Sequence, residues 1–439
     1  MRNIALILNS DQPRSGVFAD YPHGNSLGIP MYALASTELS AFCCIVITNY
    51  ADQRELLRCR VQLQRYLQQG GKLVFNGHVV YPFLDELQPY KATHETGLAG
   101  LQVYNLNAHP IFTDIENSEL TYRKGVAGFY GRGFNPPPAG AQVLTELGSQ
   151  ARLPLDWLYT YPGGGQLLAH AGNDFLSFSN APSAHGMRQA FYEWAAATPV
   201  PGAGVATSKA ARYLAELFPK ADPTTSLDKA HAARVCFVEG GTYFHHRTLH
   251  TPEFAPYLQM HRHVLDLTPD DFAAADTLVF CCDTRGDLIA RHRNAIARFL
   301  EQGKTVVAMG NTNPQQWLPQ VRWTDCPTNF WWWITPGADS GLRLVWPEHS
   351  LFNYISLADA TWHQHGSFAV PEGARSLIDK EGCGSVLYED SHSTPGRLIV
   401  TSLDPCYHHG SYFMPATTRF LRGFLPWLHA HTTRAELPI

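Results

Sequence analysis

The chain has 439 residues, which at about 100–200 residues a domain favours two domains. Hydrophobic residues make up 45% of it and charged residues 16%, a balance typical of a globular protein and not of a disordered one. Its 33 basic and 38 acidic residues give a net charge of −5, which argues against a protein held on nucleic acid by bulk charge. We therefore expect no nucleic acid among its partners.

The first half opens with a short apolar strand, Ile4–Leu8, which the polar residues Asn9 to Asp11 end. This run is too short for the core of a signal peptide, and no stretch reaches the roughly 20 apolar residues of a membrane helix. The nine cysteines include no CxxC pair and no zinc-ribbon spacing. We therefore expect no membrane association and a cytoplasmic protein with buried, free thiols.

A strand, a helix and a strand follow in the first half. The apolar run Phe42 to Thr48 has the length of a buried strand, and Leu73–Phe75 forms another. Between them a helix ends at Gly70, a residue suited to a C-terminal cap. The apolar positions of this helix recur near helical spacing and are Leu56, Leu57, Val61, Leu63 and Leu67.

The rest of the first half predicts two more strands, Gly165–His170 and Asp174–Phe178, and an apolar helix, Met187–Ala197. A segment rich in Pro and Gly begins at Thr198, and a helix-like piece spans Ser208–Phe218. We expect domains at residues 1–200 and 231–439, with residues 201–230 as a linker that contains this short helix.

The second half repeats the pattern of the first. Arg58 to His78 aligns without a gap on Arg291 to Asn311, so that Gly77 falls on Gly310. Further matches follow in the same order downstream. The second half also predicts the same kinds of element, which are the strands Val235–Val238, Thr277–Cys281, Thr305–Ala308, Ser385–Tyr388 and Leu398–Ser402 and the closing helix Thr417–His429. The sequence therefore predicts an α/β protein with an internal pseudo-repeat of two tandem, doubly wound, mostly parallel-sheet domains that are flavodoxin-like.

The segment Arg65 to His78, RYLQQGGKLVFNGH, resembles the class I glutamine amidotransferase-like superfamily. It is most similar to the trehalose-utilisation-type members and to the trimerisation domain of certain β-galactosidases; a generic flavodoxin-like domain is the alternative. Active members carry a cysteine nucleophile on a tight glycine turn after this strand. The two matching turns hold His78 and Asn311 there instead. The resemblance thus implies a shared fold, no glutamine hydrolysis and a tendency to self-associate.

Histidine is concentrated in the second half, where 15 of the 21 lie at or after His231. Ligands of open parallel sheets bind outside the carboxyl ends of the strands, and several histidines follow strands there. With Asp283 and Asp404 they suit a divalent metal such as zinc, iron or manganese. The candidate metal ligands are His245, His246, His408 and His409; His261 with His263, and His363 with His365, form HxH pairs. The alternative is a set of solvated loop histidines, since no HExxH motif occurs.

Candidate ligand-binding residues lie at the glycine turns and in the segment Gly125 to Phe134. His78 suits a base or a polar contact, and Asn311 a hydrogen-bonding role. In the glycine-rich segment, Tyr130 offers a stacking surface and Arg132 an anion contact. The alternative is that these residues only satisfy local backbone or form a tight connector.

Aromatic residues cluster between Trp317 and Trp333 in a Pro-rich context, with three consecutive tryptophans at Trp331–Trp333. Such residues stack on sugar rings or bind a partner. The alternative is that they cover the sheet or seal the interface between the two halves.

Two functions fit these observations. The first is a non-catalytic protein that binds a small molecule or a protein partner through two degenerate domains. The second is a metal-assisted hydrolase that uses the histidine-rich second half and requires its candidate ligands to converge in a cleft.

Overall fold

The computed structural model describes residues 3–9, 26–200, 234–258, 260–328 and 330–431. The chain divides into two compact units, residues 1–225 and 226–439. The predicted linker and its helix-like piece, Ser208–Phe218, lie outside the described residues. Within the described segments, no helix has the length and apolar character needed to cross a membrane.

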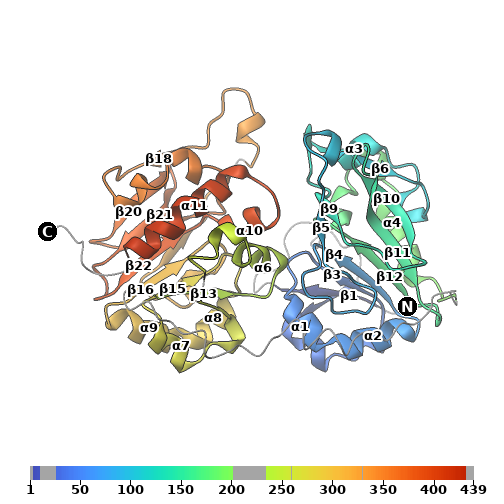
Figure 1. Cartoon of the computed structure of the whole chain (residues 1–439), viewed down its shortest axis with the longest axis horizontal. Coiled ribbons are helices and arrows are strands. Elements are labelled where there is room, and N and C mark those ends of the chain that lie inside the picture. The colour runs from blue at the N-terminus through green and yellow to red at the C-terminus, as the bar shows by residue number, and fades with distance from the viewer. Residues whose placement is uncertain (1–2, 10–25, 201–233, 259, 329, 432–439) are drawn as a thin grey trace. The chain divides into compact units, whose positions relative to one another are not determined.

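The first unit is built on a mixed sheet of eight strands, of which five neighbouring ones are parallel (Figure 1). In order across the sheet the strands are β2 (Ser26–Pro30), β1 (Asn3–Leu8), β3 (Phe42–Ile47), β4 (Lys72–Asn76), β12 (Gln166–His170), β11 (Leu153–Thr160), β10 (Gln142–Leu147) and β6 (Val103–Asn105). The last three are antiparallel to their neighbours.

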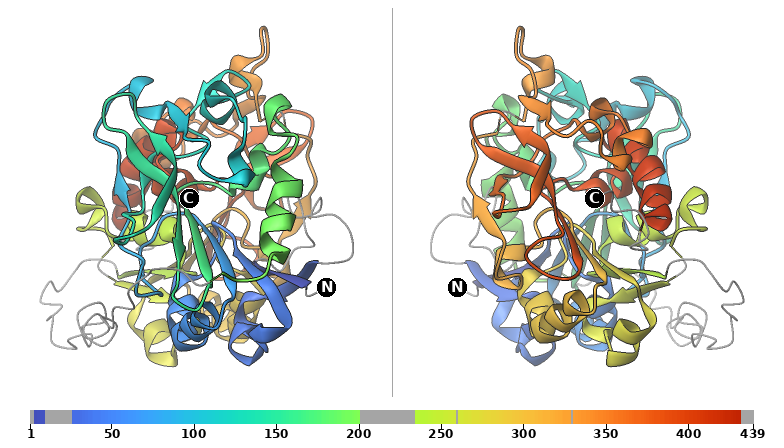
Figure 2. Two further views of the ribbon diagram at one scale, coloured as in Figure 1. Left: turned by 90° about the vertical axis from the view of Figure 1, so that its right-hand side faces the viewer. Right: turned by 90° about the vertical axis from the view of Figure 1, so that its left-hand side faces the viewer.

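Helices cover both faces of this sheet. Successive strand residues point to opposite faces, so Ile7 packs with α1 (Gln53–Arg58) and α2 (Arg60–Gln68), whereas Leu6 packs with α4 (Met187–Ala196). Figure 2 shows α4, in green, beside the sheet. Burial on both faces explains why the parallel strands read as continuous apolar runs.

The second unit repeats the parallel part of this arrangement. Its sheet runs in the order β14 (Met260–His263), β13 (Val235–Glu239), β15 (Thr277–Phe280), β16 (Thr305–Ala308), β22 (Arg397–Thr401), β21 (Gly384–Asp390), β19 (Ser367–Ala369) and β17 (Arg322–Thr324). In addition, β20 (Arg375–Lys380) pairs with β21, and β18 (Leu342–Leu344) pairs with β20. The first five are parallel. Thr305, which the internal alignment places over Lys72, has the same central position between two parallel neighbours.

The closing helix of the second unit is α11 (Pro415–Ala430), drawn in red in Figure 2. Phe420 and Phe424 of this helix pack in one core with Phe237 and Val279 of the central strands. The two predicted helix-capping glycines are confirmed in conformation: Gly70 has φ 94° and Gly303 has φ 79°, in the left-handed region that favours glycine.

Two predictions about strands need correction. Residues 175–178 form a 3-10 helix, Phe175–Phe178, because Phe175, Leu176 and Phe178 turn together into the core and not to alternate faces. The antiparallel strand β11 was not predicted, because Pro154 and Asp156 interrupt its apolar pattern. The sheets, predicted to be mostly parallel, are mixed, with antiparallel strands beside five parallel ones in each.

The prediction that every cysteine is a free thiol is wrong. Cys326 and Cys383 form a disulfide, and the other seven cysteines are free. The two lie 57 positions apart, and they meet because the chain leaving β17 and the chain entering β21 both border β19. Disulfides persist in oxidising compartments, so this pairing removes part of the basis for a cytoplasmic location, which stays a prediction.

Alkylation under denaturing, non-reducing conditions should modify seven of the nine cysteines, with Cys326 and Cys383 recovered as one linked peptide pair by mass spectrometry. Replacing both by alanine should lower the free energy of unfolding by about 2–4 kcal/mol, because the denatured chain loses a constraint on a long loop. Alkylation of all nine in protein kept from reductants would contradict the pairing.

A buried carboxylate, Glu389 of β21, is held by two nitrogen donors, one from a histidine and one from an arginine. His349 Nε2 lies 3.1 Å from Glu389 Oε2, and Arg397 of the neighbouring strand forms an ion pair with the same oxygen. Burial acts to raise the pKa of Glu389, but the hydrogen bond from His349 and the charge of Arg397 outweigh it and hold the pKa at about 2.

A lowered carboxyl pKa stabilises the folded state above the unfolded pKa of about 4.5, and this stability is lost as the pH falls toward 2. Glu389→Gln should therefore destabilise the second unit by about 3 kcal/mol near pH 7, with a difference that shrinks below pH 4.5. This difference in the free energy of unfolding is measured by denaturant titration at several pH values, with tryptophan fluorescence as the signal. A difference independent of pH between 7 and 3 would show that the charge of Glu389 is not the cause.

Candidate metal centre

Polar residues follow three neighbouring parallel strands of the second unit at the point where each strand ends. Asp283 comes after β15, Asn311 after β16, and Asp404 after β22. Because these strands are parallel, their carboxyl ends share one edge of the sheet, which is where ligands of such sheets bind.

Three histidines from two other segments reach this edge. His408 lies on α10 (Pro405–Gly410), which begins directly after Asp404, and His363 and His365 lie in the connection before β19. His365 Nε2 is 3.2 Å from Asp404 Oδ2, and His408 Nε2 is 3.3 Å from the same oxygen. His408 Nε2 also lies 3.0 Å from His363 Nε2. We call His363, His365, His408 and Asp404 the histidine–aspartate cluster.

The spacing of these atoms suits donors around one ion. Two donors that each lie 2.0–2.1 Å from a tetrahedral zinc ion are about 3.3 Å apart, close to the three distances above. The ligand atoms of His363, His365 and Asp404 all lie within 4.8 Å of one another. Asp404 and His408 are buried while His363 and His365 are partly exposed, so the cluster is reached from one side.

The carboxylate of Asp404 is oriented by a neighbour outside the cluster. Trp362 Nε1 donates a hydrogen bond of 2.9 Å to Asp404 Oδ1, which leaves Oδ2 directed at His365 and His408. Such supporting contacts fix the ligands of metal sites.

Asp283 and Asn311 form a second polar pair at the same edge. Asn311 Nδ2 donates to Asp283 Oδ1 at 3.0 Å, whereas Asp283 Oδ2 is buried without a hydrogen-bond partner. Both residues have left-handed backbone, with φ 62° at Asp283 and φ 37° at Asn311. Strained backbone of this kind clusters at functional sites.

Burial and the neighbouring charges shift the pKa values of this edge in different directions. Burial raises the pKa of Asp283 to about 6, with the nearby Asp404 adding to the effect, and lowers the pKa of His363 to about 3. For Asp404 burial alone would raise the pKa, but the charge of His408 and the hydrogen bonds with His365 and His408 bring it well below its usual value. His363 is therefore neutral at pH 7, the form that binds metals.

Of the four predicted metal ligands, only His408 belongs to the cluster. His245 accepts from Gly240 N at 3.1 Å through Nδ1, and its Nε2 lies 2.6 Å from the carbonyl oxygen of Cys282. His409 places its two ring nitrogens 2.9 Å from the hydroxyls of Thr251 and Thr418. The ring of His246 stacks on His250 with 4.2 Å between centroids. The four do not converge as one ligand set.

His363 and His365 were noted in the sequence only as an HxH pair. The signal that points to them is this spacing, since alternate residues of an extended segment share a side. Asn311, predicted at the degenerate nucleophile position, does lie at this edge beside Asp283.

The ligand-binding residues predicted in the first unit do not meet in one cluster. The ring of His78 is buried and stacks on Tyr90 with 3.6 Å between centroids. Tyr130 is wholly buried, and its hydroxyl donates to Asp156 at 2.9 Å. Arg132 donates through Nε to Gly128 O at 3.0 Å. A ligand-binding role for His78, Tyr130 and Arg132 stays a prediction.

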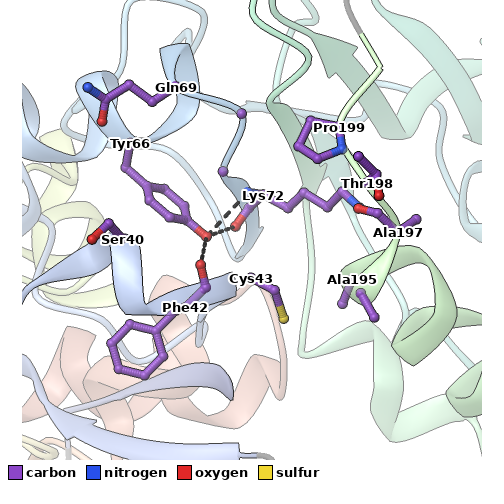
Figure 3. A pocket seen from close by; sticks show the side chains of 13 residues that line it. Ser40, Phe42, Cys43, Tyr66, Gln69, Lys72, Ala195, Ala197, Thr198 and Pro199 are labelled. Carbon is purple, nitrogen blue, oxygen red and sulfur yellow. Dashed lines mark hydrogen bonds between the residues drawn. The ribbon is translucent and has the colours of Figure 1, made fainter. Parts of the chain in front are cut away.

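A cavity of about 330 Å³ lies at the opposite, amino ends of β3 and β4 in the first unit (Figure 3). The hydroxyl of Tyr66 bonds there with the carbonyl oxygens of Phe42 and Lys72 at 3.4 and 3.2 Å. Lys72 Nζ donates to the carbonyl oxygens of Trp194 and, at 2.7 Å, Ala197. These polar groups tie strands to the end of α4, so the cavity is a weaker candidate than the histidine–aspartate cluster.

No protein-family model and no curated protein match the chain. Among solved structures it is similar to a cold-adapted β-galactosidase from Rahnella sp. R3, with 14% identity, a TM-score of 0.27, and coverage of 43% of this chain and 31% of the enzyme. It is also similar to the N-terminal domain of mmIFT52, with 11% identity, a TM-score of 0.28, and coverage of 45% of this chain and 99% of that domain. A third similar structure is the exo-β-1,4-mannosidase Op5Man5 from Opitutaceae bacterium strain TAV5, with 11% identity, a TM-score of 0.26, and coverage of 46% of this chain and 37% of the enzyme. The chain thus spans about a third of each glycosidase, and scores this low carry no functional argument.

The purified protein should contain one divalent metal ion per chain by elemental mass spectrometry, and chelation should lower the melting temperature of the second unit by roughly 10 °C. Loss of a residue that only supports a metal ligand lowers metal affinity by about 10–100-fold. His363→Ala and Asp404→Asn remove ligands themselves, so each should lower the affinity for the metal by more than that.

The matched control is His409→Gln, a change at the buried neighbour of His408 whose ring bonds to threonines instead. It should keep the metal. Equal metal content in all three variants would rule out the cluster as the binding site.

Proposed function

We propose that the second unit binds one divalent metal ion through the histidine–aspartate cluster and that the chain is a metal-dependent hydrolase. The observation that carries this proposal is the meeting of four ligand side chains, from two segments of the chain, at the carboxyl edge of the sheet. Nε2 of His363 and Nε2 of His408 lie 3.0 Å apart, and His408 Nε2 lies 3.3 Å from Asp404 Oδ2. Buried polar groups arranged in this way are stabilised by a shared cation.

The chemistry of the donors favours zinc. Imidazole nitrogen suits zinc, copper, iron and nickel, and one carboxylate oxygen completes a typical zinc set. A bound zinc ion lowers the pKa of its water to about 7 and polarises a carbonyl group. Catalytic zinc sites use three protein ligands and leave one position to water, and His363, His365 and Asp404 would supply such a set of three.

Asp283 is the group best placed to move a proton. Asn311 engages Asp283 Oδ1 and fixes the carboxylate, while the buried Oδ2, which has no hydrogen-bond partner, would accept a proton from a water that reaches it. In ester hydrolysis the water oxygen bonds to the acyl carbon and the bond from that carbon to the leaving oxygen breaks. Asp283 Oδ2 takes the water proton and returns it to the leaving oxygen.

We also infer that each unit has a flavodoxin-like core related to the class I glutamine amidotransferase-like superfamily. The support is the order of its parallel strands, which numbered along the chain is 2-1-3-4-5, the order of flavodoxin-like sheets. The glycine turns at Gly77 and Gly310 follow the fourth strand in both units.

A non-catalytic ligand-binding protein is the second candidate. It is favoured by the residues at the two glycine turns, His78 and Asn311, neither of which supplies the cysteine nucleophile of the superfamily. On this proposal the ion would hold a ligand without hydrolysing it. The first unit would then have a structural role or a binding role of its own.

Asp283→Asn distinguishes the two candidates. The zinc-loaded variant should hydrolyse 4-nitrophenyl acetate about 10²–10⁴-fold more slowly than the wild type, because the proton acceptor is lost. Its metal content and the visible spectrum of its cobalt-substituted form should be unchanged, because Asp283 is not a ligand. Absorbance of the released 4-nitrophenolate measures the rate.

The matched control is Asp287→Asn, the same change at a carboxylate that lies on α8 (Gly286–Ile289) and pairs with Arg285, the residue before this helix. It should keep the wild-type rate. If wild-type protein loaded with zinc is no faster than metal-free His363→Ala, the binding candidate replaces the hydrolase.

A further inference from the structure

The second unit carries an exposed aromatic segment, residues 330–334, between β17 and β18. Phe330 is 45% exposed, Trp333 43% and Ile334 38%. The rings of Trp331 and Trp333 stack with 6.4 Å between centroids. Figure 1 shows this loop, in light orange, projecting from the second unit. Large apolar side chains that gather on a surface mark an interaction site.

This segment borders the histidine–aspartate cluster. The ring of Phe330 lies 5.0 Å from that of His363 and 5.9 Å from that of His365, between centroids. A molecule that rests on Phe330 is therefore beside the two partly exposed ligands of the cluster.

The segment is anchored at its base. Thr328 Oγ1 donates to the carbonyl oxygen of Gln364 at 2.8 Å, and the Cys326–Cys383 disulfide holds the chain two residues earlier. Within the segment, Ile334 N donates to Trp331 O at 3.1 Å. An aromatic surface held in this way loses little freedom when a ligand binds.

Two hydrogen-bond donors in these segments are buried without a partner, Trp332 Nε1 and Gln364 Nε2. Gln364 is only 2% exposed and lies between the two cluster histidines in sequence. Buried donors are normally satisfied, and leaving them unpaired is costly. A ligand with hydroxyl oxygens offers acceptors to such donors, whereas a purely hydrocarbon ligand offers none.

From these features we propose that residues 330–334 and Gln364 bind a sugar ring, so that the substrate of the second unit is a carbohydrate derivative. The flat C–H face of the sugar rests on Phe330 and Trp333, and its hydroxyl oxygens accept hydrogen bonds from Trp332 and Gln364. The inference rests on the proposed hydrolase for the reaction, and it adds the class of substrate.

Saturation-transfer NMR on the full chain, loaded with zinc, tests this assignment directly. The probes are methyl β-D-glucopyranoside, methyl α-D-mannopyranoside and N-acetyl-D-glucosamine, with cyclohexanol as the ring that lacks the hydroxyl set. We expect saturation of the ring C–H protons of at least one sugar and weaker saturation of cyclohexanol. Stronger saturation of cyclohexanol than of every sugar, or none of any sugar, would overturn the proposal.

Variants locate the binding. Phe330→Ala and Trp333→Ala should each lower the affinity for the sugar about 10-fold, because an aromatic face is removed. Tyr354→Ala, at a ring that is 41% exposed and packs on His431, is the matched control and should bind as the wild type does. Unchanged binding in both platform variants would overturn the assignment.

Metal content, measured on the same samples, separates this inference from the hydrolase. Retained metal with lost sugar binding in Trp333→Ala supports the sugar platform. Sugar binding that depends on Trp333 in protein without metal would support the platform and reject the hydrolase. Stoichiometric metal without sugar binding in the wild type would reject the platform and leave the hydrolase to be decided by the rate of Asp283→Asn.

Discussion

The burial of one carboxylate organises the edge of the second unit. Asp404 is 1% exposed and follows the last parallel strand, where burial would strongly disfavour its charge. The indole of Trp362 and the imidazoles of His365 and His408 surround it and keep it ionised. A buried charge without such partners would destabilise the fold, so the connection before β19 and the start of α10 both have to close on Asp404.

The two units share an order of strands but not the chemistry of this edge. In the first unit the edge holds Asp174, which accepts from Asn49 N at 3.3 Å, and Asn49 in turn donates to Asn173. Burial raises the pKa of Asp174 to about 7, because no cation close to it outweighs the loss of solvent. At the first edge amide groups surround Asp174, and the imidazole of His170 pairs with Asp156, whereas three imidazoles surround Asp404 at the second edge. This difference between the two edges accords with the uneven distribution of histidine, most of which lies in the second half of the sequence.

Four of the five parallel strands in each sheet were predictable because burial on both faces leaves continuous apolar runs, and glycine at positive φ marks the helix ends. The edge strands β2 and β14 were missed because they are only partly buried. Of the antiparallel strands the sequence predicted Ser385–Tyr388, which lies in β21, but not β11, in which Pro154 and Asp156 interrupt the apolar pattern. The cluster was predictable in part: Asp404 and His408 lie together after a strand. His363 and His365 reach it through a connection held by Trp362, and the Cys326–Cys383 pair depends on strand order. Contacts of this kind join residues that are far apart in the sequence, so the local sequence pattern does not predict them.

Exposure changes in steps across the candidate site. Asp404 and His408 form a buried base, His363 and His365 are partly exposed above it, and Phe330 is exposed beside them. A reactive centre needs both conditions, because fixed ligands hold a charge in place only where the core supports them, while a substrate has to arrive from solvent. The segment 362–365 supplies both: Trp362 binds the buried carboxylate, and Gln364 is bonded to the chain that leads to the aromatic loop. The same short segment therefore links the core of the second unit to the surface on which a substrate would lie.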